Sequence, residues 1–146
     1  MNLFGVMEVS GSALQAERLR AEVVAANMAN AETTRTPEGG PYRRQHVVFQ
    51  SQAPDQNAFA SQLFSQADGD IGGVEISAVV SDKGSGLRRY DPQHPDADKD
   101  GYVSYPDINP LTEMVDLMGA TRAFQLNSSA VQATKSMISS SLDILK

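Results

Sequence analysis

The chain has 146 residues, which is long enough for one domain with a hydrophobic core of its own. A formal net charge of −6 argues against a nucleic-acid-binding protein, because such a protein presents a basic face to phosphate groups. Cysteine is absent, which excludes a disulfide framework, a thiol nucleophile and a cysteine-ligated metal site.

The first twenty residues, MNLFGVMEVSGSALQAERLR, differ from a secretory signal peptide. They have no basic region at their start, and Glu8 interrupts their apolar run. No stretch of the chain approaches the roughly 18 consecutive apolar residues of a membrane-spanning helix. We therefore expect no direct membrane insertion, and a protein that stays in the cytoplasm or leaves it without a cleaved signal.

Residues 1–31 are predicted to form an N-terminal helical segment, because apolar side chains recur at helical spacing between Leu3 and Ala31. Ser10 and Glu17 interrupt the apolar stripe, and Asn27 and Asn30 mark the point where the helix loosens. The stripe consists of Leu3, Met7, Leu14, Ala21, Val24 and Met28.

Residues 32–108 are predicted to form a small β-rich middle domain, since this region contains most of the prolines and most of the glycines. The segment 51–73 is rich in Gln, Ser, Ala and Gly and is predicted to be a long loop or flexible segment, with a short helical turn around Phe59–Phe64. The predicted strands are His46–Gln50, Val74–Ser81, Leu87–Tyr90 and Tyr102–Tyr105.

Residues 109–146 are predicted to form a long C-terminal helix. Asn109 is a good N-cap, Pro110 suits the first helical position, and Glu113 places a negative charge where the helix dipole favours it. A helix from Pro110 to Lys146 would be about 55 Å long. One apolar row repeats every seven residues, at Leu117, Phe124, Val131, Ile138 and Leu145, and a second row runs beside it at Ala123, Ala130, Met137 and Ile144.

These patterns predict an α+β fold in which the N- and C-terminal helices pair as an antiparallel coiled coil. The middle domain would bring the first helix back against the last. The apolar surface that remains after this pairing favours further packing within an oligomer. A monomeric helical bundle with a β appendage is the alternative that the pattern leaves open.

The stretch DADKDGYVSYPD, Asp96 to Asp107, fits the calcium loop of an EF-hand, so a calcium-binding module is an alternative function. Pro95 and Pro92 prevent the helix that should enter such a loop, and Asp and Gly are also the residues of an ordinary turn. We therefore expect no resident metal or cofactor at this loop.

Catalysis has little support in the sequence. His46 and His94 are the only histidines, and neither lies in a pattern typical of a nucleophile or a metal site. We expect no catalytic residue and no enzyme activity. Arg43 and Arg44 are interpreted as a solvated or subunit-contacting pair.

Short motifs at both ends of the chain resemble those of a known family. The first helix closes with VVAANMANAETT, GGPYRRQHVVFQ follows it, and the last helix carries NPLTEMVDLMGATRAFQLNSSAVQATKSM. These stretches resemble the axial proteins of the bacterial flagellum, and most closely those of the basal-body rod. The residues that carry the resemblance are Ala26, Asn27, Ala29, Asn30, Ala31, Thr33, 41–45, 47–49, Glu113 and 122–127.

The resemblance implies a structural subunit of the proximal rod, the drive shaft that links the rotor to the hook across the periplasm. Its partners would be other copies of itself, neighbouring rod proteins and the flagellar type III export apparatus. Another rod or hook-type axial protein, or an unrelated coiled-coil adaptor, are the alternatives. The expected assembly interface consists of Leu3, Met7, Leu14, Val24, Met28, Leu117, Phe124, Val131, Ile138 and Leu145.

Overall fold

A computed structural model describes residues 3–51, 72–84 and 86–144. Along the chain, one helix comes first and one comes last, and the strands of two small antiparallel sheets lie between them in the sequence. The prediction of an α+β fold is therefore confirmed. The predicted loop at 51–73, with its helical turn around Phe59–Phe64, lies almost wholly outside the described residues. The elements are α1 (Leu3–Ala29), β1 (Gln45–Ser51), β2 (Val74–Ser81), β3 (Leu87–Tyr90), β4 (Tyr102–Tyr105) and α3 (Pro110–Ile144).

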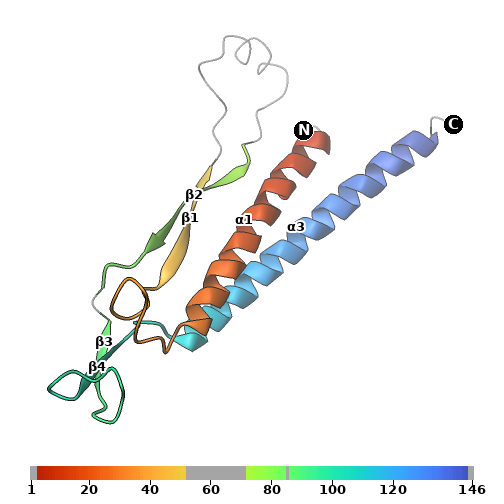
Figure 1. Cartoon of the computed structure of the whole chain (residues 1–146). Helices are drawn as coiled ribbons and strands as arrows, with labels where there is room; N and C mark the ends of the chain where they lie inside the picture. The colour runs from red at the N-terminus through yellow and green to blue at the C-terminus, as the bar shows by residue number, and fades with distance from the viewer. Residues whose placement is uncertain (1–2, 52–71, 85, 145–146) are drawn as a thin grey trace, which may run out of the picture.

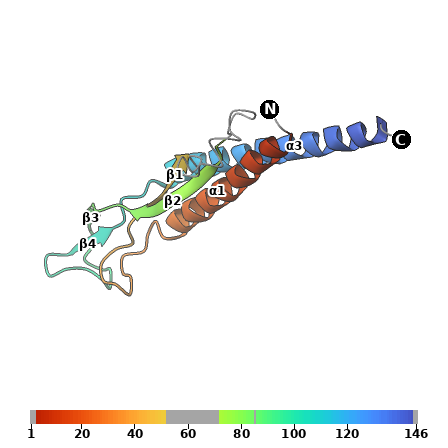
Figure 2. The same ribbon diagram turned by 90° about the horizontal axis from the view of Figure 1, so that it is seen from above.

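The helices α1 and α3 pack along each other and run in opposite directions (Figures 1 and 2). The end of α1 and the start of α3 meet at one end of the pair, beside the strands. Both termini of the chain lie toward the other end, where α3 extends beyond the start of α1 (Figure 2). The middle of the chain therefore returns the last helix antiparallel to the first.

Small side chains form the face of α3 that packs on α1. Ala120 is fully buried, and Thr134, two heptads beyond Ala120 in the same row, is also buried. The hydroxyl of Thr134 donates to the carbonyl of Ala130 at 2.9 Å, so its burial leaves no donor unpaired. Since α3 contacts no other described helix or strand, α1 is the element that covers this row. Small side chains let two helices approach closely.

The buried face of α1 also differs from the predicted stripe. Ser10 and Ala16 are buried, together with Val23, Val24 and Asn27. The prediction that Ser10 merely interrupts an apolar stripe is therefore wrong: a serine is small enough to lie inside a close contact. The helix ends at Ala29, between Asn27 and Asn30, so the prediction that these two residues mark its end is confirmed, and Asn27 itself is buried.

The antiparallel pair β1–β2 packs against α1. Val47 lies opposite Val79, and Val48 lies opposite Ala78, but Phe49 lies opposite Ile76. Ser77 is therefore an extra residue in β2, which makes a β-bulge there. At the far end of the pair, the backbone N–H of Val74 donates to the side-chain oxygen of Ser12 on α1 at 3.1 Å, which ties β2 to the helix.

The pair β3–β4 forms a separate tip beyond the end of the helix pair where α1 ends and α3 begins (Figure 1). Val103 is buried in it, whereas the neighbouring Tyr90 is exposed. Position 86 favours glycine, because a Cβ atom there would clash with the backbone carbonyl oxygen of Tyr105. Gly101 closes the turn before β4 with a φ of 78°, which favours glycine.

The predicted strands and the start of the last helix are confirmed. Strands β2, β3 and β4 have the predicted bounds, and β1 is one residue longer at each end. The side-chain oxygen of Asn109 accepts from the N–H of Leu111 at 3.0 Å, so Asn109 caps α3 and Pro110 is its first residue. At the other helix, the side chain of Asn30 donates to the carbonyl of Ala26 at 2.9 Å, just beyond the end of α1.

Candidate functional site: a polar junction and an exposed helix face

Polar side chains from three segments meet where α1 ends and α3 begins. Asn27 of α1 and Glu113 of α3 are each 1% exposed. Tyr42 and Arg44 lie in the chain that enters β1, and Gln45 is the first residue of that strand. We call these five residues the polar junction.

Asn27 uses the full hydrogen-bonding capacity of its side chain. Its Nδ2 donates to the carbonyl of Gln45 at 2.7 Å and to Oε2 of Glu113 at 3.1 Å. Its Oδ1 accepts from the N–H of Gln45 at 2.9 Å and from the hydroxyl of Tyr42 at 3.2 Å. A side-chain amide has two donors and one two-acceptor oxygen, so the match is complete. The side chain of Asn27 thus pairs with both the N–H and the C=O of Gln45, the two backbone groups that a neighbouring strand would otherwise pair with.

Glu113 is buried as a charge and is paired. Nε of Arg44 donates to its Oε1 at 2.7 Å, and the same guanidinium lies 3.5 Å from Asp116. Arg20 of α1 reaches Asp116 at 3.7 Å, so the two helices are also linked around the edge of the junction. Arg44 was interpreted as a solvated or subunit-contacting residue; the structure gives it ion-pair partners within the chain and leaves its side chain 32% exposed, and Arg43 beside it is exposed. The closest partner of Arg44 lies 69 residues away in the sequence.

Burial raises the pKa of the Tyr42 phenol, and the negative charge of Glu113 raises it further. The hydroxyl therefore keeps its proton, which it donates to Asn27. Nothing in the junction is arranged as a nucleophile beside a base, and it contains no histidine. What the arrangement can do is hold α1, the start of β1 and α3 in one fixed relation.

The residues of the expected assembly interface differ in how far they are buried. Val24 is buried inside the chain, whereas Met7 is exposed and Phe124 is 41% exposed. Leu145 lies outside the described residues. The others are half-buried, namely Leu3, Leu14, Met28, Leu117, Val131 and Ile138. The row through Leu117 and Phe124 thus lies at the edge of the α1–α3 contact.

The centre of that contact is a row that the sequence reasoning missed. It runs every seven residues through Glu113, Ala120, Asn127 and Thr134, one turn before the predicted row. Three of the four are buried and Asn127 is half-buried. The sevenfold spacing of small and polar residues was the available signal, but apolarity drew attention to the neighbouring row.

The acidic loop has its own partners within the chain. Asp96 accepts a hydrogen bond from the Thr34 hydroxyl at 2.8 Å and lies 3.8 Å from Arg35. Asp98 lies 3.8 Å from Arg88. Among the residues that the structure describes, no three acidic or histidine side chains gather into a group that could hold a metal ion. This geometry does not favour the calcium-binding alternative.

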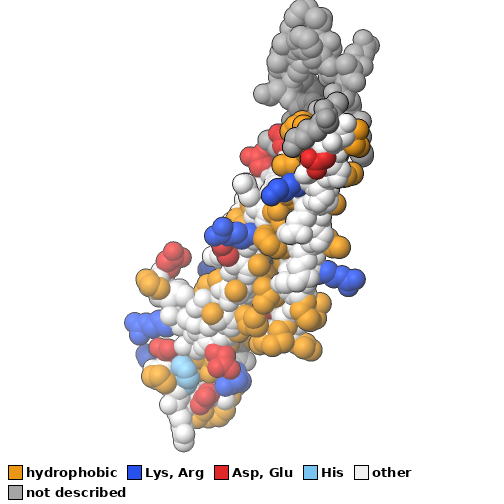
Figure 3. Space-filling model, turned by 90° about the vertical axis from the view of Figure 1, so that its right-hand side faces the viewer, with side chains coloured by type: hydrophobic (Ala, Val, Ile, Leu, Met, Phe, Trp, Pro, Cys, Tyr) orange, Lys and Arg blue, Asp and Glu red, His pale blue; other side chains and the backbone are white. Residues whose placement is uncertain are grey.

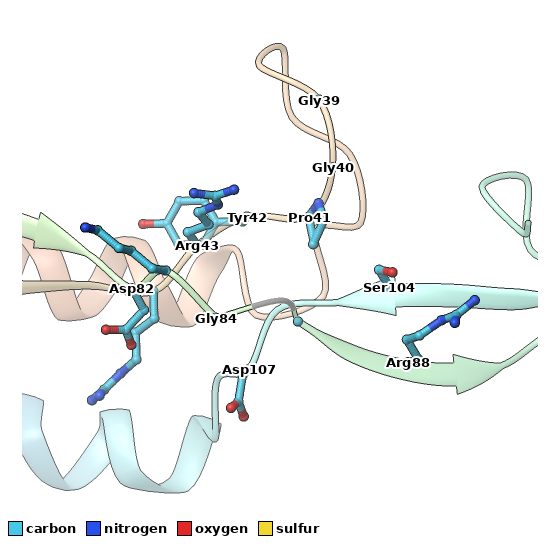
Figure 4. A pocket seen from close by; sticks show the side chains of 13 residues that line it. Gly39, Gly40, Pro41, Tyr42, Arg43, Asp82, Gly84, Arg88, Ser104 and Asp107 are labelled. Carbon is cyan, nitrogen blue, oxygen red and sulfur yellow. The ribbon is translucent and has the colours of Figure 1, made fainter.

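A cleft of about 390 Å³ lies between the base of β1–β2 and the β3–β4 tip (Figure 4). The loop with Gly39 and Gly40 borders it on one side, and Arg88 and Ser104 border it on the tip side. Its lining carries both signs of charge, on Arg43, Lys83, Asp82 and Asp107, as well as on residues already named. The cleft is open and its charges are mixed, so it is not shaped for one small ligand.

Comparison with known proteins decides the family. A sequence profile described as "Flagella basal body rod protein" matches residues 7–35, and one described as "Flagellar basal body rod FlgEFG protein C-terminal" matches residues 99–144. The flagellar basal-body rod protein FlgC of Borreliella burgdorferi is 40% identical over 151 residues, which cover 100% of this chain and 99% of the relative. The chain belongs to the FlgC family of flagellar basal-body rod proteins.

Two further members of the family agree with this assignment. FlgC of Bacillus subtilis is 42% identical over 153 residues, with 100% of both chains covered. FlgC of Salmonella typhimurium is 35% identical over 144 residues, which cover 99% of this chain and 98% of the relative. The names of these relatives describe structural parts of the basal body. The chain is thus a structural rod protein and not an enzyme.

The residues of the polar junction are also residues of the family's sequence motifs. Asn27, Tyr42, Arg44, Gln45 and Glu113 all belong to the motifs that carried the resemblance in the sequence. These motifs come together at one point of the fold.

No helix in the described part of the chain is both long and apolar enough to cross a membrane.

Proposed function

We propose that the chain is an exported subunit of the proximal rod, in which α1 and α3 pair as an antiparallel coiled coil and pack against neighbouring subunits. The neighbours are other copies of the chain and other rod proteins. The subunit acts mechanically: torque is resisted because many buried helix contacts would have to break at once.

The exposed row on α3 is the observation that carries this proposal. Phe124 remains 41% exposed after α1 and α3 have paired, and Leu117, Val131 and Ile138 beside it are only half-buried. An apolar row of this length, left partly exposed along one helix, favours a surface for protein contact. A neighbouring helix could complete the burial by packing into the same row.

The polar junction supports the mechanical part of the proposal. A shaft transmits torque only if its subunits do not deform internally. Asn27 and Glu113 tie both helices to the start of β1 through buried hydrogen bonds and an ion pair. The helical part and the β-rich part of one subunit would therefore turn together. The division into segments 1–31, 32–108 and 109–146 belongs to this proposal.

Location and export complete the proposal. The rod would span the periplasm, and the chain would reach it through the flagellar type III apparatus without removal of a signal peptide and without insertion into the membrane. The resemblance to the axial proteins supports this route. The remaining interface residues are also proposed to contribute to the helix contacts. They are Leu3, Met7, Leu14, Val24 and Met28 on α1, together with Leu145, which lies outside the described residues.

The variant Phe124→Asp tests the proposed function. The loss of ring burial has a magnitude of about 3–5 kcal/mol in protein cores, and the buried carboxylate adds a desolvation cost. We expect non-motile cells that lack rods, with normal amounts of the variant exported. The matched control is Gln132→Asp, a polar and exposed position on the same helix, which should leave motility nearly unchanged. Motile Phe124→Asp cells would remove the exposed row from the account.

A further inference from the structure

One edge of β1 carries backbone groups that β2 does not pair. In an antiparallel pair, successive residues point their N–H and C=O alternately toward the partner strand and away from it. The N–H of Asp82 donates to the carbonyl of Arg44 at 2.8 Å, so the groups of every second residue from Arg44 onward point toward β2. The extra residue of the bulge lies in β2, which leaves this alternation along β1 uninterrupted. The backbone groups of Val47 and Phe49 therefore point away from β2, and among the described helices and strands only β2 and α1 pack on β1.

The side chain of Asn27 occupies the first position along this edge. Gln45 is the first residue of β1 whose backbone groups point away from β2, and its N–H and C=O pair with the amide of Asn27 at 2.9 and 2.7 Å. A side-chain amide offers the same kinds of donor and acceptor as a peptide group. The edge thus pairs with an amide at its first position, and its next two positions, Val47 and Phe49, have no such partner among the described residues.

A cleft of about 320 Å³ runs beside this edge. Val47 and Phe49 line it from β1, Val23 and Val24 line it from α1, and the start of α3 forms the opposite wall. The strand and α3 each pack on α1 but not on each other, so α1 is the floor of the cleft. Phe49 is 38% exposed there. We call this space the β1 cleft.

The β1 cleft favours an uncharged segment with apolar side chains at every second position. Its charged side chains pair with one another within the chain; they are Arg20, Arg44, Glu113 and Asp116. Val47 and Phe49 are two residues apart and line the same side, so alternate side chains of an added strand would lie beside them. The strand β1, QHVVFQS, also lacks the lysine or proline that commonly protects an exposed edge from pairing.

The β1 edge calls for a different occupant from the exposed row of α3. Figure 3 shows hydrophobic side chains gathered on the side of the molecule that α3 forms, and a surface of this kind suits another helix. The β1 edge offers backbone donors and acceptors, which an extended chain satisfies by adding as a strand. A described strand of a second copy does not fit, because each of the four is already paired and would bring its partner strand against the α3 wall.

We propose that an extended segment of a different rod protein adds to β1 as a third strand beside Val47 and Phe49. The segment is uncharged where it enters the cleft, and its alternate apolar side chains cover Val24 and Phe49. The added strand ends at Gln45, whose backbone groups Asn27 has already paired. The inference rests on the proposed rod function and adds a contact through the backbone to the contacts between helices.

Hydrogen exchange at single amides tests the added strand. Basal bodies and the purified chain are exchanged, quenched and dissolved, and the amides of the chain are resolved by NMR. In the purified chain, the amides of His46 and Val48 should be protected by β2, and those of Val47 and Phe49 should exchange at least about tenfold faster. In basal bodies all four should be protected. If Val47 and Phe49 exchange as fast in basal bodies as in the purified chain, the inference is overturned.

Two proline variants give a second test. Val47→Pro removes an N–H that points into the cleft, whereas Val79→Pro, the matched control at the same cross-strand pair, removes one that points to the opposite edge of the sheet. Neither change removes a hydrogen bond between β1 and β2. We expect Val47→Pro to lower the amount of chain in basal bodies about tenfold or more and Val79→Pro to leave it within about twofold. Equal effects would contradict the proposal. Where the urea midpoint shows that a purified variant has failed to fold, amide exchange in the unaltered chain decides.

The source of the strand and the rod function are tested separately. A photo-reactive phenylalanine analogue at position 49 should form a cross-link in basal bodies to a different rod protein, identified by mass spectrometry. A cross-link to a second copy of the chain would overturn the assignment of the partner. If the chain is present in basal bodies but the amides of Val47 and Phe49 exchange freely, the added strand is overturned and the rod function stands. If the unaltered chain is absent from purified basal bodies, both are overturned.

Discussion

The two ends of the α1–α3 pair are stabilised in different ways. At the junction end, Asn27 and Glu113 are buried, and the hydrogen bonds of Asn27, together with the ion pair between Glu113 and Arg44, join both helices to the start of β1. At the other end, no described strand covers α3, and Leu142 and Ile144 are exposed. One end is completed by the chain itself, whereas the other leaves apolar surface for partners. A subunit that must be rigid and yet join neighbours needs both.

The largest effect on the isolated chain should come from Glu113→Ala at the junction. Glu113→Ala takes the closest partner from Arg44, which keeps only the longer contact to Asp116, and it also removes an acceptor from the buried amide of Asn27, so the loss should be about 3 kcal/mol. We expect the urea midpoint of the purified chain to fall accordingly. Asp116→Ala is the control, since its ion pairs are longer and partly exposed and should be worth less than about 1 kcal/mol. Equal losses from the two variants would mean that the junction is not the stabilised end.

The contact between the helices should be next in sensitivity. Ala120 is fully buried against α1, so Ala120→Leu adds three carbon atoms where no space exists and should cost about 1–3 kcal/mol. Ala133→Leu is the control, because Ala133 is exposed on the same helix and the change should stay within about 0.5 kcal/mol. Thermal unfolding of the two variants and of the unaltered chain measures these changes in stability. A tolerated leucine at position 120 would show that the helices do not approach as closely as the structure has them.

The smallest effect concerns Tyr42. Its pKa is raised in the folded chain, so its neutral form contributes stability that is fully present below the unfolded pKa of about 10 and is lost as the pH rises through the folded value. Tyr42→Phe should cost about 1 kcal/mol at neutral pH through the lost hydrogen bond to Asn27. It should also reduce the loss of stability above pH 10. Tyr90→Phe, at an exposed position, serves as the control and should change neither quantity.

Local patterns in the sequence predicted the elements well, because their signals lie within a few residues. Asn109 and Pro110 fixed the start of α3 through capping chemistry, and the alternation in Val74–Ser81 gave β2 its bounds. The sevenfold apolar row from Leu117 to Ile138 indicated one long helix, and the structure has that helix. The end motifs also identified the family correctly.

The candidate site was harder to predict because its contacts are distant in the sequence. Glu113 was interpreted through the helix dipole, and only Arg44, 69 residues earlier, explains how its charge can be buried. Asn27 was interpreted only as a residue near the end of a helix, but its amide also pairs with the backbone of Gln45, 18 residues later. Hydrophobicity also ranks Leu117 and Phe124 above Ala120 and Thr134, although close packing of two helices favours the smaller pair. The hydrophobicity of a side chain predicts that it is buried, but it does not predict which part of the chain or which partner buries it.

Hydrogen exchange on the purified chain, compared with the chain in basal bodies, tests the central claim most directly. We expect the isolated chain to protect the amides around Asn27 and around Glu113 to Ala120, with protection falling toward residues 3–9 and 135–144, because no residue in those two ranges is buried. In basal bodies the same distal amides should become strongly protected, as neighbours cover them. Strong and uniform protection of both helices in the isolated chain would contradict the account, because it would show a helix pair complete without partners.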